Sequence, residues 1–207
     1  LGVVDLGSNS VRLVVFEGLT RNPQVVFNEK SILGLGRGLQ ASGRLNEDAI
    51  GECITVLERY AVVAAAMRAD PVEVLATAAV RDALNGPAFV EMLRRRFPAL
   101  PIRVLDGDEE ARHSAEGVLG GITDADGVLG DLGGGSLEVV RIAGGSVTAS
   151  TTLKLGVIRL AEQAGGDVVR ARAIAEEALR GVPWLAEAAG RDLYLVGGAW
   201  RALARIH

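Results

Sequence analysis

The sequence predicts an α/β protein made of two related lobes. Two segments, beginning at Val3 and Val128, share one pattern: a strand, an aspartate, a turn of small residues and a second strand. Behind each hairpin, a third strand, a helix, a strand and a helix are expected, so the two halves form a duplicated βββαβα unit. The first lobe is expected at residues 1–121 and the second at 122–207. Because 49% of the residues are apolar and aromatic residues are few, we expect cores of Val, Leu, Ile and Ala.

The first half shows the start and stop signals of its elements. Asn46 is a suitable N-cap, and Glu47 and Asp48 follow it in the first helical turn, where acids complement the helix dipole. Pro87 suits the first turn of a later helix. The elements expected in this half are strands at 2–5, 11–17, 24–31, 72–76 and 102–105, a Gly-rich loop at 33–43, and helices ending near 67, at 87–97 and at 108–119.

The second half repeats the theme. Residues 121–127 are expected to form a crossover between the lobes. The elements expected beyond it are strands at 128–131, 137–142, 146–153 and 193–196, helices at 157–163 and 168–188, and a last helix entered through a Gly197-Gly198 turn. Cys53 lies in an apolar helical series, which predicts a small buried hydrophobic residue.

The turns of the two hairpins have the composition of a phosphate-binding site. Backbone N–H groups in a turn of Gly and Ser can approach a phosphate closely, because no large side chain blocks them. Hydroxyl and amide side chains add donors. An aspartate beside a bound phosphate would repel it, unless a divalent cation such as magnesium lies between them, so Asp5 and Asp131 indicate a metal. The alternative is two ordinary hairpin turns in which Asp and Gly have only turn roles.

Composition limits the classes of function. The net charge of −4 argues against a general nucleic-acid or membrane surface, and no GxxxxGK segment is present. No signal peptide or apolar run long enough to span a bilayer is found. The single cysteine excludes an internal disulfide framework and fits a reducing cytoplasm. The absence of a His/Cys cluster argues against zinc. The chain is expected to be a fragment, since it opens directly on a strand.

Several segments together resemble the exopolyphosphatase / guanosine pentaphosphate phosphatase family, which belongs to the actin-like, sugar-kinase-like ATPase superfamily. The resemblance covers essentially the whole chain in order. The segments that carry it are Asp5-Leu6-Gly7-Ser8-Asn9-Ser10, the loop from Leu33 to Leu45, Ala76 to Ala83, Gly107-Asp108-Glu109-Glu110-Ala111-Arg112, Asp131 to Glu138, Leu155 to Leu160 and Val196 to Ala204.

This resemblance implies two ribonuclease-H-like lobes with the active site in the cleft between them, and closure about residues 121–127. It implies that Glu110 is the base that activates water and that Arg81 contacts substrate phosphate. Magnesium, with manganese as the alternative ion, would be held by Asp131, Glu138 and Asp5. The implied phosphate-binding residues are Ser8, Asn9, Ser10, Gly133, Gly134, Gly135 and Ser136.

Two positions depart from the pattern of the family. Ala78 and Asp106 stand where many members have serine, which removes one hydroxyl and adds one negative charge. From spacing alone, Glu109 and Glu110 would be two acids that complement a helix dipole, and for Glu109 that interpretation stands. Members of the family continue into further C-terminal helical domains, and the full-length protein is expected to be a homodimer.

The predicted function is a cytoplasmic hydrolase that releases orthophosphate from the end of inorganic polyphosphate. The alternative, a guanosine pentaphosphate 5′-phosphohydrolase, cleaves the same type of bond, so the motifs cannot separate the two. A sugar or acetate kinase, or a non-catalytic actin-like nucleotide-binding protein, is a more distant alternative. The partner is therefore expected to be polyphosphate or guanosine pentaphosphate, with no nucleic-acid duplex and no membrane.

Overall fold

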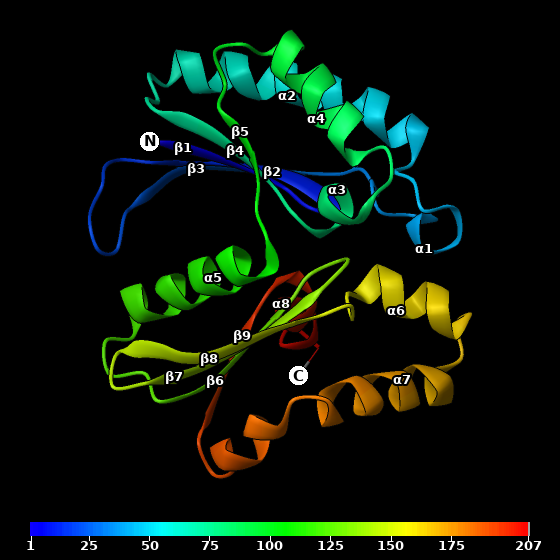
Figure 1. Cartoon of the computed structure of the whole chain (residues 1–207). Coiled ribbons are helices and arrows are strands. Elements are labelled where there is room, and N and C mark those ends of the chain that lie inside the picture. Colours follow the sequence, from blue (N-terminus) through cyan, green and yellow to red (C-terminus); the bar gives the residue numbers. More distant parts are fainter. Residues whose placement is uncertain (207) are drawn as a thin grey trace. The chain divides into compact units, whose positions relative to one another are not determined.

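Nine strands build two separate β-sheets in this computed structural model, in which residues 1–206 are described (Figure 1). The chain divides into one unit at Leu1–Leu105 and a second that begins at Asp106. The boundary expected after residue 121 differs from this division, because the helix that ends at Gly121 packs on strands of the second unit. Residues 122–126 therefore connect two elements of one unit, and the chain passes between the units at Leu105–Asp106.

The first sheet has the strand order β3-β2-β1-β4-β5. Strands β1 to β3 form an antiparallel meander, and β4 and β5 are added parallel to β1. The strands are β1 (Gly2–Leu6), β2 (Ser10–Phe16), β3 (Val25–Ile32), β4 (Val72–Ala76) and β5 (Ile102–Val104).

The helices of the first unit follow the predicted signals. Asn46 caps α2 (Glu47–Ala66) by accepting a hydrogen bond from the backbone N–H of Ala49 at 3.0 Å, as predicted. The other helices are α1 (Leu39–Ser42), which lies in the predicted loop, α3 (Ala78–Asp82) and α4 (Gly86–Arg96). Figure 1 shows α2 and α4 over one face of the sheet.

The first unit has one continuous hydrophobic core on that face. Val11, Leu13 and Val15 of β2 point into it together with Leu57 and Tyr60 of α2. Cys53 is buried in the same core as predicted, and burial raises the pKa of its thiol to about 12. The alternate residues of the strands lie on the opposite face of the sheet, and none of those on β1 and β2 is buried.

The second sheet has the order β8-β7-β6-β9, again with an antiparallel meander and one parallel strand beside its first strand. Its strands are β6 (Gly127–Leu132), β7 (Leu137–Ala143), β8 (Ser146–Leu153) and β9 (Asp192–Val196). Its helices are α5 (Gly107–Gly121), α6 (Val157–Ala164), α7 (Val168–Arg180), the 3₁₀ helix η1 (Pro183–Ala188) and α8 (Gly198–Leu203).

The second sheet is covered on both faces by its own unit. Ala111 and Ala115 of α5 pack with Leu129 and Val140 in one cluster. A second cluster joins Val128 and Val139, which have the opposite strand parity, to Ala188, and the flanking Trp184 and Leu185 belong to η1. This unit therefore has two small cores where the first unit has one large core.

The helix predicted over 168–188 is the main correction to the predicted elements. It is divided into α7 and η1, because Gly181 ends the first helix and Pro183 opens the 3₁₀ helix.

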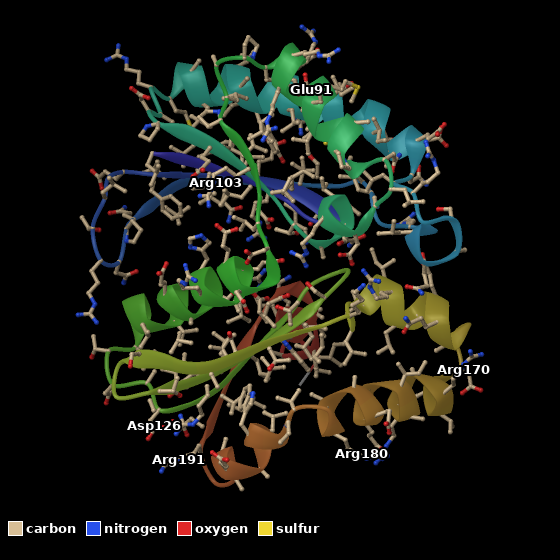
Figure 2. All side chains as sticks on the ribbon, viewed as in Figure 1. Glu91, Arg103, Asp126, Arg170, Arg180 and Arg191 are labelled. Carbon is tan, nitrogen blue, oxygen red and sulfur yellow. The ribbon has the colours of Figure 1, made fainter. Side chains whose placement is uncertain are left out.

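Near the start of β6, Asp126 forms ion pairs with Arg141 at 2.7 Å and Arg191 at 2.5 Å (Figure 2). No helix formed by residues 1–206 is both long and apolar enough to cross a bilayer.

Candidate active site

The two predicted hairpins have the same backbone geometry. In the first, Gly7 N–H donates to the Ser10 carbonyl at 3.0 Å, and Asp5 lies opposite Arg12. In the second, Gly133 N–H donates to the Ser136 carbonyl at 3.0 Å, and Asp131 lies opposite Glu138. The turns 7–10 and 133–136 thus have the same backbone hydrogen bond, and each follows the C-terminal end of the first strand in its unit.

The carbonyl groups of the first turn are held from behind by the Gly-rich loop. The Ser8 carbonyl accepts the Gly36 N–H at 2.8 Å, and the Asn9 carbonyl accepts those of Leu33 and Gly34 at 2.9 Å. Gly36 comes so close that a Cβ there would lie 3.1 Å from the Cβ of Ser8. The Gly-rich loop at residues 33–43 therefore fixes the direction of the peptide groups in the first turn.

The second turn is held by the start of α6. The Gly133 and Gly134 carbonyls accept the N–H groups of Val157 and Ile158, each at 3.0 Å. The Arg159 side chain donates its Nε–H to the Gly135 carbonyl at 2.7 Å. Gly156 touches the turn so closely that a Cβ there would lie 2.1 Å from the Gly134 carbonyl carbon and the Gly135 nitrogen, so no larger residue fits without moving the turn.

This arrangement leaves the N–H groups of both turns available. Among residues 1–206, no acceptor is found for the backbone N–H of Ser8, Asn9, Gly134, Gly135 or Ser136. Successive N–H groups in a tight turn whose carbonyls point elsewhere form a concavity that suits an anion. Ser8 and Ser136 are buried residues, 5% and 4% exposed.

The acids beside the second turn form an unusual pair. Asp131 and Glu138 are directly opposite each other on β6 and β7, and Glu138 is only 2% exposed. Burial raises the pKa of the Asp131 carboxyl, while a hydrogen bond from Ser114 and the charge of Arg201 act to lower it. The Ser114 hydroxyl donates to Oδ2 of Asp131. Two carboxylates held together in this way are suited to a cation.

Glu110 lies in the first turn of α5, and the start of that helix is firmly defined. The Asp106 side chain accepts the Glu109 N–H at 2.8 Å, and the Glu109 side chain accepts the Asp106 N–H at 3.0 Å, which is a complete capping box. Asp106, one of the two departures from the family pattern, is thus the N-cap of this helix, a role that serine can also fill. A Cβ at Gly107 would lie 2.5 Å from Oγ1 of Thr152, so glycine lets the helix start reach β8.

The same helix joins Glu110 to the acidic pair. Ser114 follows Glu110 by four residues and therefore lies on the same face of α5. Since Ser114 contacts Asp131, the face of α5 that carries Glu110 continues onto the end of β6. The contact of Ser114 with Asp131 was not predicted from the sequence, although the four-residue spacing of Ser114 from Glu110 indicated a shared helix face. The hydrogen bond from Arg159 to the second turn could not be predicted from the sequence, because it depends on how α6 packs against that turn.

Arg81 lies on α3 in the first unit. Its guanidinium donates to the Leu105 carbonyl at 2.9 Å and lies 3.7 Å from the Asp82 carboxylate. The N–H of Thr77, just before α3, donates to the Leu6 carbonyl at 3.2 Å, so this helix begins beside the first turn. The predicted role of Arg81 on substrate phosphate stays a prediction.

The predicted metal ligands lie in both units: Asp5 on β1, and Asp131 and Glu138 on β6 and β7. Among the residues described, no three His, Cys, Asp or Glu side chains gather closely enough to hold a metal ion. Magnesium in phosphate-transfer sites takes only one or two carboxylates, with waters and phosphate oxygens as its other ligands. The Asp131–Glu138 pair matches that donor set.

Comparison with known proteins agrees with this geometry. The model of the Ppx/GppA phosphatase family matches residues 14–206. The chain belongs to the Ppx/GppA phosphatase family. It is 36% identical over 173 residues to Exopolyphosphatase 2 of Mycobacterium tuberculosis, covering 79% of this chain and 54% of that protein. It is 30% identical over 162 residues to a guanosine-5′-triphosphate,3′-diphosphate pyrophosphatase of Photobacterium profundum, covering 77% of this chain and 32% of that protein.

Solved structures confirm the predicted fold of this family member. An exopolyphosphatase from Cytophaga hutchinsonii matches with a TM-score of 0.85 and 26% identity, over 99% of this chain and 69% of that chain. A weaker likeness to a PilM-PilN complex, at a TM-score of 0.54 and 14% identity, shows the fold alone. The fold is that of the actin-like, sugar-kinase-like ATPases, as predicted. The chain spans about half (54%) of the length of the Mycobacterium relative.

Proposed function

We propose that this chain is the phosphate-binding and catalytic part of an exopolyphosphatase, which hydrolyses the terminal phosphoanhydride of inorganic polyphosphate. The observation that carries the proposal is the pair of matched turns, whose carbonyls are held from behind and whose N–H groups are available to phosphate. Membership of the Ppx/GppA family and the similarity to a protein named Exopolyphosphatase 2 support it.

In the proposed reaction, the turn amides and the hydroxyls of Ser8, Ser10 and Ser136 bind phosphate oxygens, and Arg81 adds a positive charge. Glu110 orients a water molecule and accepts its proton as the water attacks the terminal phosphorus. The bridging P–O bond breaks as the new bond forms, so orthophosphate is released and the shortened polyphosphate departs as the leaving group. Most of the rate enhancement comes from positioning and from charge neutralisation, as is general for phosphoryl transfer. Asp131 and Glu138, with Asp5 as a further candidate, would hold magnesium. When bound, the ion supplies positive charge to the phosphate oxygens.

A guanosine pentaphosphate phosphohydrolase is the second candidate, and the similarity to the Photobacterium pyrophosphatase favours keeping it. Both substrates end in the same phosphoanhydride. The turns bind phosphate groups through backbone donors and contain nothing that would read a base or a ribose, so the choice between the substrates requires measurement.

The test is release of orthophosphate by this chain with magnesium, from long-chain polyphosphate and from guanosine pentaphosphate. Glu110→Gln should lower kcat by about 10²–10⁴-fold, because it removes the base. Glu109→Gln is the matched control, since it removes a neighbouring charge while keeping a side chain that can complete the capping box. Equal turnover by the Glu110→Gln variant and the wild type would refute the role of Glu110, and no release from either substrate would refute the activity.

A further inference from the structure

Three residues of the second sheet form one row across its antiparallel strands. The register places Asp131 of β6 opposite Glu138 of β7, and Glu138 opposite Thr152 of β8. Residues directly opposite each other on neighbouring strands point to the same side of a sheet. A threonine hydroxyl therefore extends the acidic pair by one position.

Helix α5 lies along this row. Its first residue, Gly107, reaches Thr152, since a Cβ at Gly107 would lie 2.5 Å from Oγ1 of Thr152. Two turns later on the helix, Ser114 donates to Asp131. Seven residues of a helix advance about 10.5 Å, and two strand spacings, from β8 to β6, span about 9.6 Å. The helix therefore crosses the strands from Thr152 to Asp131, and Glu138 lies beneath the part of the helix that joins these two contacts.

Packing alone does not explain the hydroxyl of Thr152. Its Oγ1 is buried, and no hydrogen-bond partner is found for it among residues 1–206. The neighbouring Thr151 points to the other face of the sheet, and its Oγ1 accepts a hydrogen bond from the indole N–H of Trp184 at 3.3 Å. Burying a hydroxyl without a partner destabilises a fold, and valine would fill the same space as Thr152 without that cost. Thr152 therefore calls for a role other than packing.

The sheet register sets Glu138 within reach of this hydroxyl. Directly opposed residues have Cβ atoms about 4.5–5.5 Å apart, a separation that a hydroxyl and a carboxylate can bridge. Carboxylates that bind a metal ion are usually hydrogen-bonded by further groups that orient them. Ser114 is such a donor for Asp131. Thr152 is the hydroxyl placed to do the same for Glu138, on the opposite side of the acidic pair.

We propose that Thr152 is a positioning residue, whose hydroxyl donates to the Glu138 carboxylate and orients it towards a bound divalent cation. This inference rests on the proposed function, because it concerns one of the proposed magnesium ligands. The hydroxyl has a single proton to donate, so it engages one carboxylate oxygen and leaves the other oxygen for the cation. Glycine at position 107 is then required, because a Cβ there would push Thr152 out of the row.

The test is manganese binding to this chain without substrate, followed by electron paramagnetic resonance. Thr152→Val removes the hydroxyl and keeps a β-branched side chain, and the dissociation constant should rise about ten-fold. Thr152→Ser keeps the hydroxyl and should stay within about three-fold of the wild type. Thr151→Val is the matched control on the other face of β8, and it should change the constant by about two-fold at most. Equal affinities of the wild type and Thr152→Val would overturn the inference, and so would an equal loss in the serine variant or in the control.

A double-mutant cycle identifies the carboxylate that accepts the hydrogen bond. In a Glu138→Gln background, Thr152→Val should weaken manganese binding by no more than about two-fold, because the carboxylate that it orients is already gone. A further ten-fold loss in that background would place the action of the hydroxyl on another group, such as Glu110, and would overturn the role at Glu138.

Failure of the proposed function can be told apart from failure of this inference. If the wild type binds manganese but releases no phosphate, the activity is refuted, and the manganese affinities still decide the role of Thr152. If the wild type binds no manganese, the inference is overturned, whereas phosphate release is judged by its own assay. In a chelator, Thr152→Val should melt no lower than the wild type, because it removes a buried hydroxyl without a partner. A lower melting temperature would reveal a structural role for the hydroxyl and overturn the inference.

Discussion

The two hairpins share one backbone and differ in the residue opposite the aspartate. Asp5 faces Arg12 on an exposed sheet surface, so its charge has a cation as neighbour. Asp131 faces the buried Glu138; burial raises the pKa of Asp131, and a hydrogen bond from Ser114 and the charge of Arg201 only partly offset this. A duplicated fold thus has one turn set beside positive charge and one beside negative charge. We infer that the second turn depends on a cation more strongly than the first.

The two turns also differ in how tightly they are held. The first is backed by backbone N–H groups of a loop, and a Cβ at Gly36 would lie 3.1 Å from the Cβ of Ser8, a tight contact that a small shift of the side chain could relieve. The second is backed by α6 and by the Arg159 side chain, and Gly156 allows an approach that no other residue could make. The same requirement, to turn the carbonyls away from the ligand, is met by two different segments.

The largest expected effect comes from Gly156→Ala. The new Cβ would lie 2.1 Å from backbone atoms of the second turn, so the turn or α6 must move. We expect kcat/KM to fall about 100-fold or more, because a displacement of about 1 Å in a positioned site can cost that much. Gly36→Ala is the matched change at the first turn, where the nearest atom is a side-chain carbon at 3.1 Å, and its effect should be at least ten-fold smaller. Equal effects would show that the two turns are held equally tightly.

A second comparison replaces each aspartate by asparagine. Asp131→Asn should lower kcat/KM about 100-fold and weaken the dependence on magnesium, whereas Asp5→Asn should cost roughly ten-fold less. A magnesium titration of phosphate release for both variants is the measurement. The inferred asymmetry between the hairpins would be wrong if Asp5→Asn had the larger effect.

Asp131→Asn should also make the metal-free protein more stable to unfolding than the metal-free wild type. The pKa of Asp131 is raised in the folded state, so the folded protein retains a proton that the unfolded chain has already lost near pH 3.8. Metal-free wild type should therefore lose stability as pH rises from that value through the raised folded pKa. Asp131→Asn has no such charge and should be more stable than the wild type at pH 7. Urea melts between pH 4 and pH 7 in a chelator test this, and equal pH dependence in both proteins would count against it.

Ser114 gives a smaller effect that separates positioning from packing. Ser114→Ala removes the hydrogen bond to Asp131 and should weaken magnesium or manganese affinity about ten-fold, as is usual for groups that orient a metal ligand. Ser114→Thr keeps a hydroxyl and should restore affinity to within about three-fold. Manganese binding followed by electron paramagnetic resonance, without substrate, is the readout. If the threonine variant binds manganese as weakly as the alanine variant, the hydroxyl does not position Asp131.

How much could be predicted from sequence depends on the range of the interactions. The duplicated strand order, the Asn46 cap and the buried Cys53 follow from local pattern, and the structure confirms them. The division of the chain after Leu105 could not be predicted, because it depends on α5 packing against β7 and β8 rather than on a linker composition. The break between α7 and η1 had a signal in the sequence, because Gly181 and Pro183 are both unfavourable inside a helix. The apolar pattern of residues 168–188 favoured one continuous helix, and the prediction followed that pattern.

The smallest expected effect concerns the cores. The first unit has one large cluster on one face of its sheet, and the second has two smaller clusters on opposite faces, so the second should open at lower denaturant concentration. The chain contains its own reporters, since the single cysteine, Cys53, lies in the first unit and both tryptophans, Trp184 and Trp200, lie in the second. Burial raises the pKa of the Cys53 thiol to about 12, so at pH 8 a thiol reagent should modify it only when the first unit opens. We expect the tryptophan fluorescence to change at a urea concentration roughly 1 M below that at which Cys53 reacts, a separation set by the area each core exposes. Coincident transitions would instead mean that the two units unfold as one cooperative structure, and the difference between their cores would then have no separate thermodynamic consequence.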